Sequence, residues 1–504
     1  MVNMISKTDY IRWRECPKDA WLAVHKPEFY YSFEPTEFEI ALRETGSRVE
    51  VIARGLFPGG VLIEGRDQPA RQRTHELIAA NTPVIFQPVV FNDGFLAAAD
   101  VLELNPKTGG YNIYEIKSSS SVKPEYLYDV AFQTLLFRRC GVRVEKVFVV
   151  HLNRDYIRRG DLDLDQLFVK AEQTTQTEEV AENVNREMGE AKTYLVNETE
   201  PAGSCPCIYK GRSNHCTTFQ YSNPQVPEYG VHDISRIGTS PKKLREMVDT
   251  GTFELDKIPT HIALTENQKN QITAYSSGVN VVQKAAIAAE LQGLEFPLHF
   301  IDYETHLSAI PLFDGWSPNR QVQFQYALYV VEASGAEPVR KDFLHTKMED
   351  PDPVFVASLQ EHVGPKGSII VWNKSFECSL VNKAIVARRP EYQAFFEDFN
   401  SRVYDLRDIF TKQYYVHKDL WGKTSIKNVL PVLAPELSYK ELDIREGATA
   451  SAAWPKIVWG EADETERKRI CEALLKYCGL DSYAMCAIWL ALCKMTDSEA
   501  KTSG

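Results

Sequence analysis

The chain lacks any run of about 18 consecutive apolar residues, so we expect no membrane-spanning helix. Its first residues, Met1–Lys7, also lack the apolar segment of a secretory signal peptide, and a cytoplasmic location is therefore the default expectation. Internal repeats and low-complexity tracts are absent as well. With 44% hydrophobic, 25% charged and 11% aromatic residues, the composition is that of an ordinary globular protein.

The chain also lacks an excess of positive charge. Its formal net charge is −12, from 57 basic and 69 acidic residues, and this does not predict nucleic-acid binding. Metal-dependent nucleases nevertheless have acidic centres, and short basic strips such as Arg138–Arg139 and Lys242–Lys243 could contact phosphates. Charge therefore neither supports nor excludes a nucleic-acid substrate.

Cysteines are unevenly distributed along the 504 residues. Six occur singly in apolar or helical contexts and are typical of small core residues; they are Cys140, Cys378, Cys471, Cys478, Cys486 and Cys493. The others are Cys16 and a late trio, Cys205, Cys207 and Cys216. In a chain without a secretion signal, clustered cysteines favour a metal centre over disulfides.

The clearest motif is Phe300–Thr305, an apolar run that contains Asp302 and Glu304. The run predicts a buried strand, and side chains two residues apart on a strand leave from the same face. Two carboxylates on one face repel each other unless a cation lies between them, and oxygen ligands suit hard divalent metals. By itself, the pair is equally explained by one buried and one solvated acid.

Two further motifs follow in order. The predicted core strand Ile369–Trp372 leads into Asn373-Lys374-Ser375-Phe376-Glu377. Near the C-terminus a helical run from Leu474 through Trp489 contains Tyr477 and Asp481, which are four residues apart and share one helix face.

This order of D-x-E, N-x-x-F-acid and Y-x-x-x-D resembles the three motifs of DnaQ-like exonucleases, the DEDDy branch of the ribonuclease-H-like fold. The resemblance implies that Asp302, Glu304, Glu377 and Asp481 hold two Mg²⁺ or Mn²⁺ ions, and that Tyr477 orients the attacking water. Glu377 departs from the pattern, because these enzymes usually carry Asp there. Its longer arm changes the expected metal geometry.

The N-terminal half carries a second acidic pattern. Runs at Pro83–Val90 and Phe95–Leu102 predict paired strands with a turn at Asn92-Asp93-Gly94, and Asp100 ends the second run. The next predicted strand, Tyr111–Lys117, places Glu115 and Lys117 on one face. A bare E-x-K is a weak signal, since charged strand ends are common.

An Asp at one strand end followed by E-x-K on the next strand resembles the PD-(D/E)XK nucleases. By this resemblance Asp100 and Glu115 bind a divalent metal, and Lys117 activates water and stabilises the developing anion. The helix predicted at Tyr126–Phe137 places Gln133 where RecB-type nucleases have their Q-x-x-x-Y glutamine, near the active site. Glu50, on a helix predicted from about Pro35 to Arg54, matches a metal-approaching position of those relatives; an exposed helical Glu is the alternative.

The opening Tyr10–Leu22 predicts two helices broken at Pro17 and resembles the start of RecB-family nucleases. In those relatives the early cysteine joins a late trio to hold a 4Fe-4S cluster, which here implies ligands Cys16, Cys205, Cys207 and Cys216. The C-x-C spacing departs from the commoner C-x-x-C. Zinc bound by the same thiolates is the alternative.

The segment Gly422–Pro431, with Tyr404-Asp405-Leu406 before it, resembles a bacterial family in which an exonuclease-like domain follows a RecB-like nuclease domain. This resemblance extends over essentially the whole chain. Asp405 is a candidate fifth acid, although a strand-end Asp that caps the next turn is favoured. We therefore expect an α/β protein with a PD-(D/E)XK restriction-endonuclease-like domain at residues 1–222 and a ribonuclease-H-like exonuclease domain at residues 293–504.

Residues 223–292 are predicted to form a helical connector, with Ser240 as a helix N-cap and a longer helical stretch from Leu264 to Leu291. The expected activity is metal-dependent hydrolysis of phosphodiester bonds, with DNA favoured over RNA. Two alternatives remain open. One has a single active nuclease whose other domain only binds nucleic acid, and the other is a non-catalytic scaffold or regulator with protein partners in repair or defence.

Overall fold

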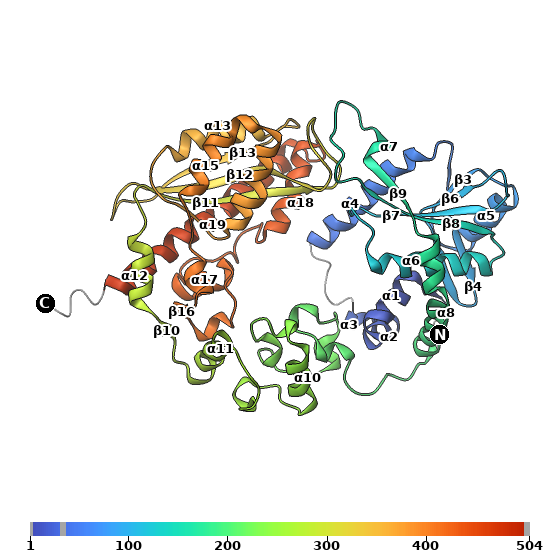
Figure 1. Cartoon of the computed structure of the whole chain (residues 1–504), viewed down its shortest axis with the longest axis horizontal. Helices are drawn as coiled ribbons and strands as arrows, with labels where there is room; N and C mark the ends of the chain where they lie inside the picture. The colour runs from blue at the N-terminus through green and yellow to red at the C-terminus, as the bar shows by residue number, and fades with distance from the viewer. Residues whose placement is uncertain (1–3, 31–36, 498–504) are drawn as a thin grey trace. The chain divides into compact units, whose positions relative to one another are not determined.

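The structure is a computed structural model that describes residues 4–30 and 37–497, and it contains two compact units (Figure 1). The first unit comprises residues up to 209 together with 213–225 and 308–320. The second comprises 210–212, 226–307 and the chain from 321 onward. The stretch predicted as a connector thus clusters largely with the second unit, whereas the segment 308–320 clusters with the first.

The first unit combines helices with a six-stranded and a three-stranded sheet. Its helices are α1 (Lys7–Glu15), α2 (Pro17–His25), α3 (Pro27–Tyr30), α4 (Glu37–Ala53), α5 (Gln68–Ala79), α6 (Pro124–Arg139), α7 (Leu164–Leu167), α8 (Thr174–Val196) and α9 (Phe219–Ser222). Its strands are β1 (Ile5–Ser6), β2 (Val61–Leu62), β3 (Val84–Phe86), β4 (Val89–Asn92), β5 (Phe95–Ala98), β6 (Val101–Leu104), β7 (Tyr111–Ile116), β8 (Val144–Leu152) and β9 (Phe168–Glu172).

The larger sheet has the order β2-β3-β6-β7-β8-β9. Strands β6 and β7 are antiparallel, whereas β7 and β8 are parallel and are connected through α6. The runs predicted as two long strands are four short ones, because Gln87 (φ 53°) breaks the first run and Ala99–Asp100 separate β5 from β6. The predicted turn is present: Asp93 and Gly94 have positive φ and connect the antiparallel β4 and β5.

Helix α6 supplies much of the core of this unit. Its residues Val130, Ala131, Phe132, Leu136 and Phe137 are fully buried. The ring of Phe132 stacks on Tyr10 of α1 at 5.0 Å between centroids and meets Phe95 of β5 edge-on at 5.9 Å. One aromatic side chain therefore connects three elements. The predicted break between α1 and α2 is confirmed, with Pro17 at the first position of α2.

The second unit contains a five-stranded sheet and a two-stranded one. Its helices are α10 (Pro241–Asp249), α11 (Glu266–Ser277), α12 (Lys284–Gln292), α13 (Asp352–Val363), α14 (Lys383–Arg388), α15 (Gln393–Ser401), α16 (Asp408–Thr411), α17 (Ile426–Leu433), α18 (Gly447–Val458) and α19 (Glu464–Asp497). Its strands are β10 (Val281–Val282), β11 (Leu298–Ser308), β12 (Arg320–Val331), β13 (Val339–Leu344), β14 (Ile369–Val371), β15 (Val403–Asp405) and β16 (Tyr415–Val416).

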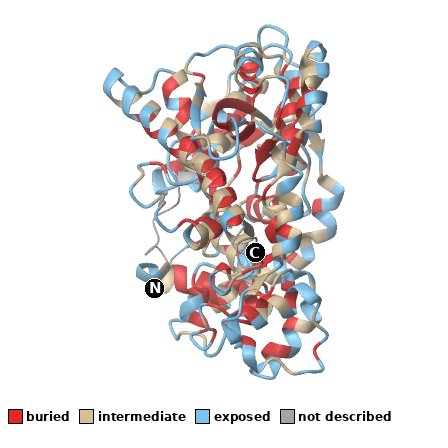
Figure 2. Ribbon diagram, turned by 90° about the vertical axis from the view of Figure 1, so that its left-hand side faces the viewer, coloured by how far each residue is buried: buried red, intermediate tan, exposed pale blue. Residues whose placement is uncertain are grey.

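The five-stranded sheet has the order β13-β12-β11-β14-β15. Strands β12 and β13 are antiparallel, whereas β14 runs parallel to both β11 and β15. Buried side chains of α13 and α15 pack on one face of this sheet, and those of α17 and α19 form the core on the other (Figure 1). Figure 2 shows buried residues concentrated along the strands and the inward sides of the helices. The central strand β11 is thus covered on both faces.

The helical stretch predicted from Leu264 to Leu291 is two helices, because Gly278 (φ 66°) ends α11 in a left-handed conformation and β10 intervenes. Thr265 caps α11 through a capping box. Ser240 does precede α10 as predicted, but its side chain makes no capping hydrogen bond.

Helix α19 is longer than the predicted run. Its segment Glu464–Thr496 is long and apolar enough to cross a membrane by length and composition alone, and 56% of its most apolar window is buried inside the structure. Buried helices of water-soluble domains pass the same test. In this helix the burial comes from packing against α12, α17 and α18.

We predict that Phe132→Ala destabilises the first unit by about 3–5 kcal/mol, because it leaves a cavity between α1, α6 and β5. Hydrogen exchange of peptides from α6 and β5 measures the loss as faster exchange. Leu62→Ala, at a side chain that is 45% exposed, is the control and should leave this exchange close to that of the wild type.

Candidate metal centres

The two acids of the clearest motif lie together on β11, as the period-two pattern predicts. A carboxylate oxygen of Asp302, one of Glu304 and the sulfur of Cys478 all lie within 4.8 Å of one another. Strand β11 is central in the sheet, between β12 and β14, where the connections diverge to opposite sides. Ligand sites of open α/β sheets form at such a switch point.

Helix α19 brings the third motif to the same place. Both Tyr477 and Tyr439 donate hydrogen bonds to the carboxylate of Asp481. The charge of Asp481 raises the pKa of Asp302 and of Glu304, which shows that the three carboxylates are close. Cys478 donates a hydrogen bond from its thiol to the backbone carbonyl of Asp302, which ties α19 to β11.

Two further segments complete the surroundings of these acids. The Lys427 ammonium, on α17, lies 5.2 Å from the ring centroid of Tyr477 and 5.4 Å from that of Tyr439. Gly447, the first residue of α18, has no side chain; a Cβ built there would lie 3.6 Å from Glu304 Oε2 and 3.8 Å from the Tyr477 hydroxyl. A larger side chain at Gly447 would therefore extend over the acids.

The carboxylates are buried without enough positive charge to balance them. Burial first, and then the charges of Asp481, Glu304 and Glu377, raise the pKa of Asp302 well above its ordinary range. Burial and Asp481 do the same to the pKa of Glu304. Lys427 lowers both but does not outweigh burial. The folded chain therefore retains protons on these acids at a pH where free carboxyls are ionised.

Glu377 lies beside this group rather than within it. It is buried on η7 (Ser375–Asn382), a π-helical segment, and among the described residues its Oε2 has no hydrogen-bond partner. Burial raises the pKa of Glu377 to about 8, and Asp405 adds to the shift. Asp405 accepts hydrogen bonds from the backbone N–H of Lys374 (2.8 Å) and Arg407 (3.1 Å), so it caps the turns on both sides.

The first unit brings Asp100, Glu115 and Lys117 together at one end of β6 and β7. Asp100 accepts a hydrogen bond from the backbone N–H of Ile116 (2.7 Å), which fixes the start of β6 to the end of β7. The Lys117 ammonium lies 2.9 Å from Glu115 Oε1 and 2.7 Å from Asp129 Oδ2. Lys7 contacts the same Glu115 oxygen at 2.7 Å.

The remaining predicted residues of this unit contact those three. Gln133 is fully buried and donates from Nε2 to Glu115 Oε2 at 2.7 Å. The Gln87 amide donates both to Glu50 Oε1 (2.7 Å) and to Asp100 Oδ1 (3.1 Å), and thereby connects the two acids. Glu50 also pairs with Arg54 at 2.6 Å, so it is not the free, exposed helical residue of the alternative interpretation.

The two acids of this unit have opposite electrostatic environments. Burial, followed by the charges of Glu115 and Glu50, raises the pKa of Asp100 to about 7. Burial also disfavours ionised Glu115, but Lys7 and Lys117 outweigh it and hold the pKa of Glu115 below its ordinary value. One carboxyl thus tends to be protonated at neutral pH while its neighbour stays ionised.

The four clustered cysteines converge as predicted. Their sulfurs all lie within 4.8 Å of one another, and this group could hold a metal ion. Cys216 Sγ lies 3.7 Å from both Cys16 Sγ and Cys205 Sγ. The Asn223 amide donates to Cys205 Sγ at 3.2 Å.

Hydrogen bonds around the thiols fix helix α2 to the late loop. Asp19 Oδ1 accepts from both the backbone N–H (2.8 Å) and the hydroxyl (2.7 Å) of Thr218, and Lys18 donates to the carbonyl of Gly203 at 2.5 Å. The Sγ–Sγ distances fit thiolates that bind a single tetrahedral ion, for which a metal–sulfur bond of about 2.3 Å implies sulfurs about 3.8 Å apart.

Several contacting residues were missed by the sequence analysis. Tyr439 and Lys427 contact the acids of the second unit, and Lys7 and Gln87 contact those of the first. Lys427 lies in the segment Gly422–Pro431, which the sequence singled out for its resemblance but to which no role was given. The other three belong to no motif, and no spacing in the sequence distinguishes them.

We predict that Asp302→Asn has opposite effects in the absence and presence of divalent metal. The raised pKa values mean that ionisation of these acids destabilises the fold, so metal-free stability should fall as pH rises above about 4, the ordinary carboxyl range. Asp302→Asn removes one repelling charge and should raise the apparent unfolding temperature in EDTA at pH 8.

In the wild type, saturating Mg²⁺ or Mn²⁺ should stabilise the second unit by about 2.7 kcal/mol at one hundred times Kd, and Asp302→Asn should lose this gain. Thermal unfolding with and without metal measures both effects. Asp443→Asn, at an exposed position, is the matched control. Equal stabilisation of the wild type and Asp302→Asn by metal would contradict the assignment of the acids as ligands.

Comparison with known proteins gives one family match. Residues 299–425 match the model of a family described as "Domain of unknown function (DUF2779)", and this segment includes Asp302, Glu304 and Glu377 but ends before Asp481. No curated protein matches the chain. The chain is therefore similar, over the region from β11 to the residue before α17, to a family whose description assigns no activity.

Proposed function

We propose that the chain is a metal-dependent nuclease whose second unit hydrolyses phosphodiester bonds in the manner of a 3′–5′ exonuclease. The observation that carries this proposal is the convergence of Asp302, Glu304 and Asp481 from a strand and a helix almost 180 residues apart, buried around one point. Buried like charges cost stability, so a fold that gathers them favours a role that needs them together.

The residues fit a site for hard divalent cations, because carboxylate oxygens are their preferred ligands and the protons retained here are exchangeable for metal. Asp302, Glu304 and Asp481 would hold the ions, with Glu377 approaching from the side of Asp302. Bound Mg²⁺ or Mn²⁺ would lower the pKa of the attacking water and stabilise the attacking and leaving oxygens. The Cys478 thiol is not a candidate ligand, because burial and the nearby acids raise its pKa well above the ordinary value.

The chain's own groups have definable parts in this reaction. Tyr477, whose hydroxyl lies near Glu304 and Asp481, would hold the attacking water by hydrogen bonding. Lys427 provides a positive charge beside the acids and is positioned to offset negative charge on a phosphate. The absence of a side chain at Gly447 leaves room for a substrate next to Glu304.

We further propose that the first unit is a PD-(D/E)XK nuclease site in which Asp100 and Glu115 bind metal and Lys117 stabilises the developing charge. The contacts of Gln133 and Lys117 with Glu115 support this proposal. One observation favours the alternative that this unit only binds nucleic acid: Lys7 and Lys117 already neutralise Glu115, so a metal would have to compete with two cations.

DNA is the favoured substrate because the resemblance to RecB-type nucleases points to DNA, with RNA as the second candidate. We expect Asp302→Asn to lower the rate constant of strand cleavage by roughly 10³-fold, since it removes a metal ligand. Lys117→Ala should lower a separate endonucleolytic activity by about 10²–10³-fold. End-labelled single- and double-stranded DNA and RNA with Mg²⁺ or Mn²⁺ measure both.

Controls for these assays are Asp443→Asn and Lys146→Ala, which remove equal charges at exposed positions of the same two units. Loss of all cleavage in Asp302→Asn, with Lys117→Ala unaffected, would assign the first unit to binding alone. Absence of cleavage by the wild type on every substrate, despite bound metal, would contradict the proposed function and favour a non-catalytic scaffold or regulator.

We propose that the four cysteines hold a metal centre that fixes α2 to the loop around residues 205–216. Two cofactors compete for this assignment. The resemblance to RecB-family nucleases favours a 4Fe-4S cluster, whereas the 3.7 Å sulfur separations favour a single zinc ion, because each thiolate of a cubane binds a different iron and the sulfurs are spread more widely.

Metal analysis of anaerobically purified chain distinguishes the two cofactors. Zinc predicts about one metal per chain with no visible absorption, and a cluster predicts about four irons with charge-transfer absorption. Cys205→Ser should lower the metal content and loosen α2, detected as faster hydrogen exchange. Cys140→Ser, at a cysteine outside the group, is the control. Full-length chain with neither metal would contradict both assignments.

A further inference from the structure

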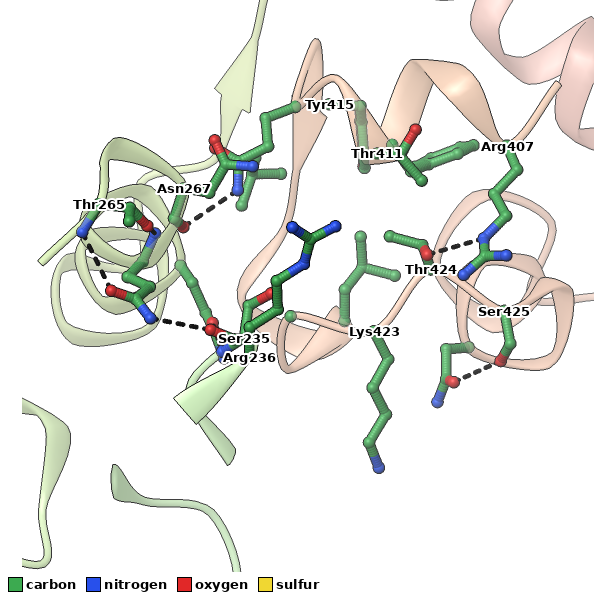
Figure 3. A pocket seen from close by; sticks show the side chains of 18 of the residues that line it. Ser235, Arg236, Thr265, Asn267, Arg407, Thr411, Tyr415, Lys423, Thr424 and Ser425 are labelled. Atoms are coloured by element: carbon green, nitrogen blue, oxygen red, sulfur yellow. Dashed lines mark hydrogen bonds between the residues drawn. The ribbon is translucent and has the colours of Figure 1, made fainter. Parts of the chain in front are cut away.

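A second concave site in the second unit has the opposite charge to the acid cluster. It is a cavity of about 840 Å³ formed by η5 (Ile237–Thr239), α10 and α11 on one side and by the chain from Arg407 to Asn428 on the other (Figure 3). Four cations line it, Arg236, Lys243, Arg407 and Lys423, and the rest of the lining is chiefly Ser, Thr, Asn and Gln. No carboxylate lines it, in a chain whose net charge is −12.

The four cations are not neutralised within the described residues, where none of them forms an ion pair with a carboxylate. Arg407 Nε donates to the Thr424 hydroxyl at 3.0 Å, and Lys243 donates to the carbonyl of Ala263. Arg236 and Lys423 are exposed. Unneutralised like charges on a concave polar surface generate a positive potential that attracts anions.

Arg236 is fixed in an unfavourable backbone conformation. Its φ is 57°, in the left-handed region that non-glycine residues seldom adopt. Two glutamines of α11 hold the preceding residue: the Ser235 N–H donates to Gln271 Oε1 at 2.9 Å, and Gln268 Nε2 donates to the Ser235 carbonyl at 2.9 Å. Strain that is held in this way commonly marks a functional position. Figure 3 shows the Arg236 side chain extending toward the middle of the cavity.

The opposite wall depends on Gly422. Its φ is +67°, and a Cβ there would lie 2.4 Å from Gln271 Nε2, so only glycine allows this loop to approach α11 so closely. Because Gln271 also donates to the Tyr229 hydroxyl and the Asp233 carbonyl, it cannot readily move aside. The close approach fixes the position of Lys423, which follows Gly422 and precedes the N-terminus of α17.

Helix α17 connects this cavity with the acid cluster. Ser425, its N-cap, and Asn428 line the cavity, whereas Lys427 lies against Tyr477 and Tyr439 beside the acids. Residues adjacent on a helix point about 100° apart, so a single turn presents side chains to both sites. A strand with one phosphate at the acids would therefore have neighbouring phosphates near the cavity.

We propose that this cavity binds the backbone phosphates of the single nucleic-acid strand whose end reaches Asp302 and Glu304. This inference rests on the proposed function. Successive phosphates are favoured over one small anion because the cations come from four separate segments. In Figure 3 Arg236, Arg407 and Lys423 are well separated and do not converge on one point. Single-strand sites commonly combine such a positive groove with sequence tolerance.

The test measures binding rather than cleavage. Full-length chain carrying Asp302→Asn is titrated with a fluorescein-labelled single strand, DNA or RNA, in Mg²⁺ at several salt concentrations, with anisotropy as the readout. Adding Arg236→Asn and Lys423→Gln should weaken binding roughly 10-fold and flatten the plot of log K against log salt by about 1.4, since each lost phosphate contact on a single strand contributes about 0.7. Asn at position 236 tolerates the left-handed backbone.

The matched control is Lys468→Gln with Arg469→Gln, which removes the same charge from exposed positions of α19 and should leave the slope unchanged. An unchanged slope in the cavity variant, an equal change in the control, or no binding by the parent would each overturn the inference. Displacement of the strand by equimolar pyrophosphate would also overturn it, because the cavity would then be a small-anion site.

Failure of the proposed function gives a different result. If the chain with Asp302 intact cleaves nothing while the cavity variant still loses affinity and slope, the nuclease assignment is wrong and the phosphate site remains. If the wild type cleaves while the cavity variant binds as its parent does, only the cavity assignment is wrong.

Discussion

Repulsion among buried carboxylates is the constraint around which the second unit is organised. Asp302, Glu304 and Asp481 come from β11 and α19, and burial raises the pKa of each. The fold limits the cost with hydrogen bonds from Tyr439 and Tyr477 and with the nearby charge of Lys427. These neighbours leave the acids short of positive charge, and a divalent cation supplies what is missing.

The first unit solves a similar problem with lysines. Glu115 accepts hydrogen bonds from Lys7, Lys117 and Gln133, so this buried acid stays ionised. Asp100, a short distance away, lacks such partners and has a raised pKa of about 7. Neighbouring carboxyls with separated pKa values are typical of acid–base sites. The two units thus offer different electrostatic starting points for the same class of chemistry.

Charge is segregated within the second unit rather than mixed. The acids are gathered on the sheet, and the cations Arg236, Arg407 and Lys423 are gathered at the cavity, with α17 between them. Such separation reconciles a net charge of −12 with binding of a polyanion, because local potential rather than net charge governs association. The overall charge was therefore uninformative about the substrate.

Local periodicity determined much of what the sequence could predict. The two-residue repeat put Asp302 and Glu304 on one face of β11, the four-residue spacing put Tyr477 and Asp481 on one face of α19, and Pro17 separated α1 from α2. These predictions hold because backbone geometry alone fixes such relations. Packing between distant segments decided the rest: Tyr439, Lys427 and Gly447 reach the acids, and Arg236 meets Lys423, only because β11, α11, α17 and α19 fold against one another.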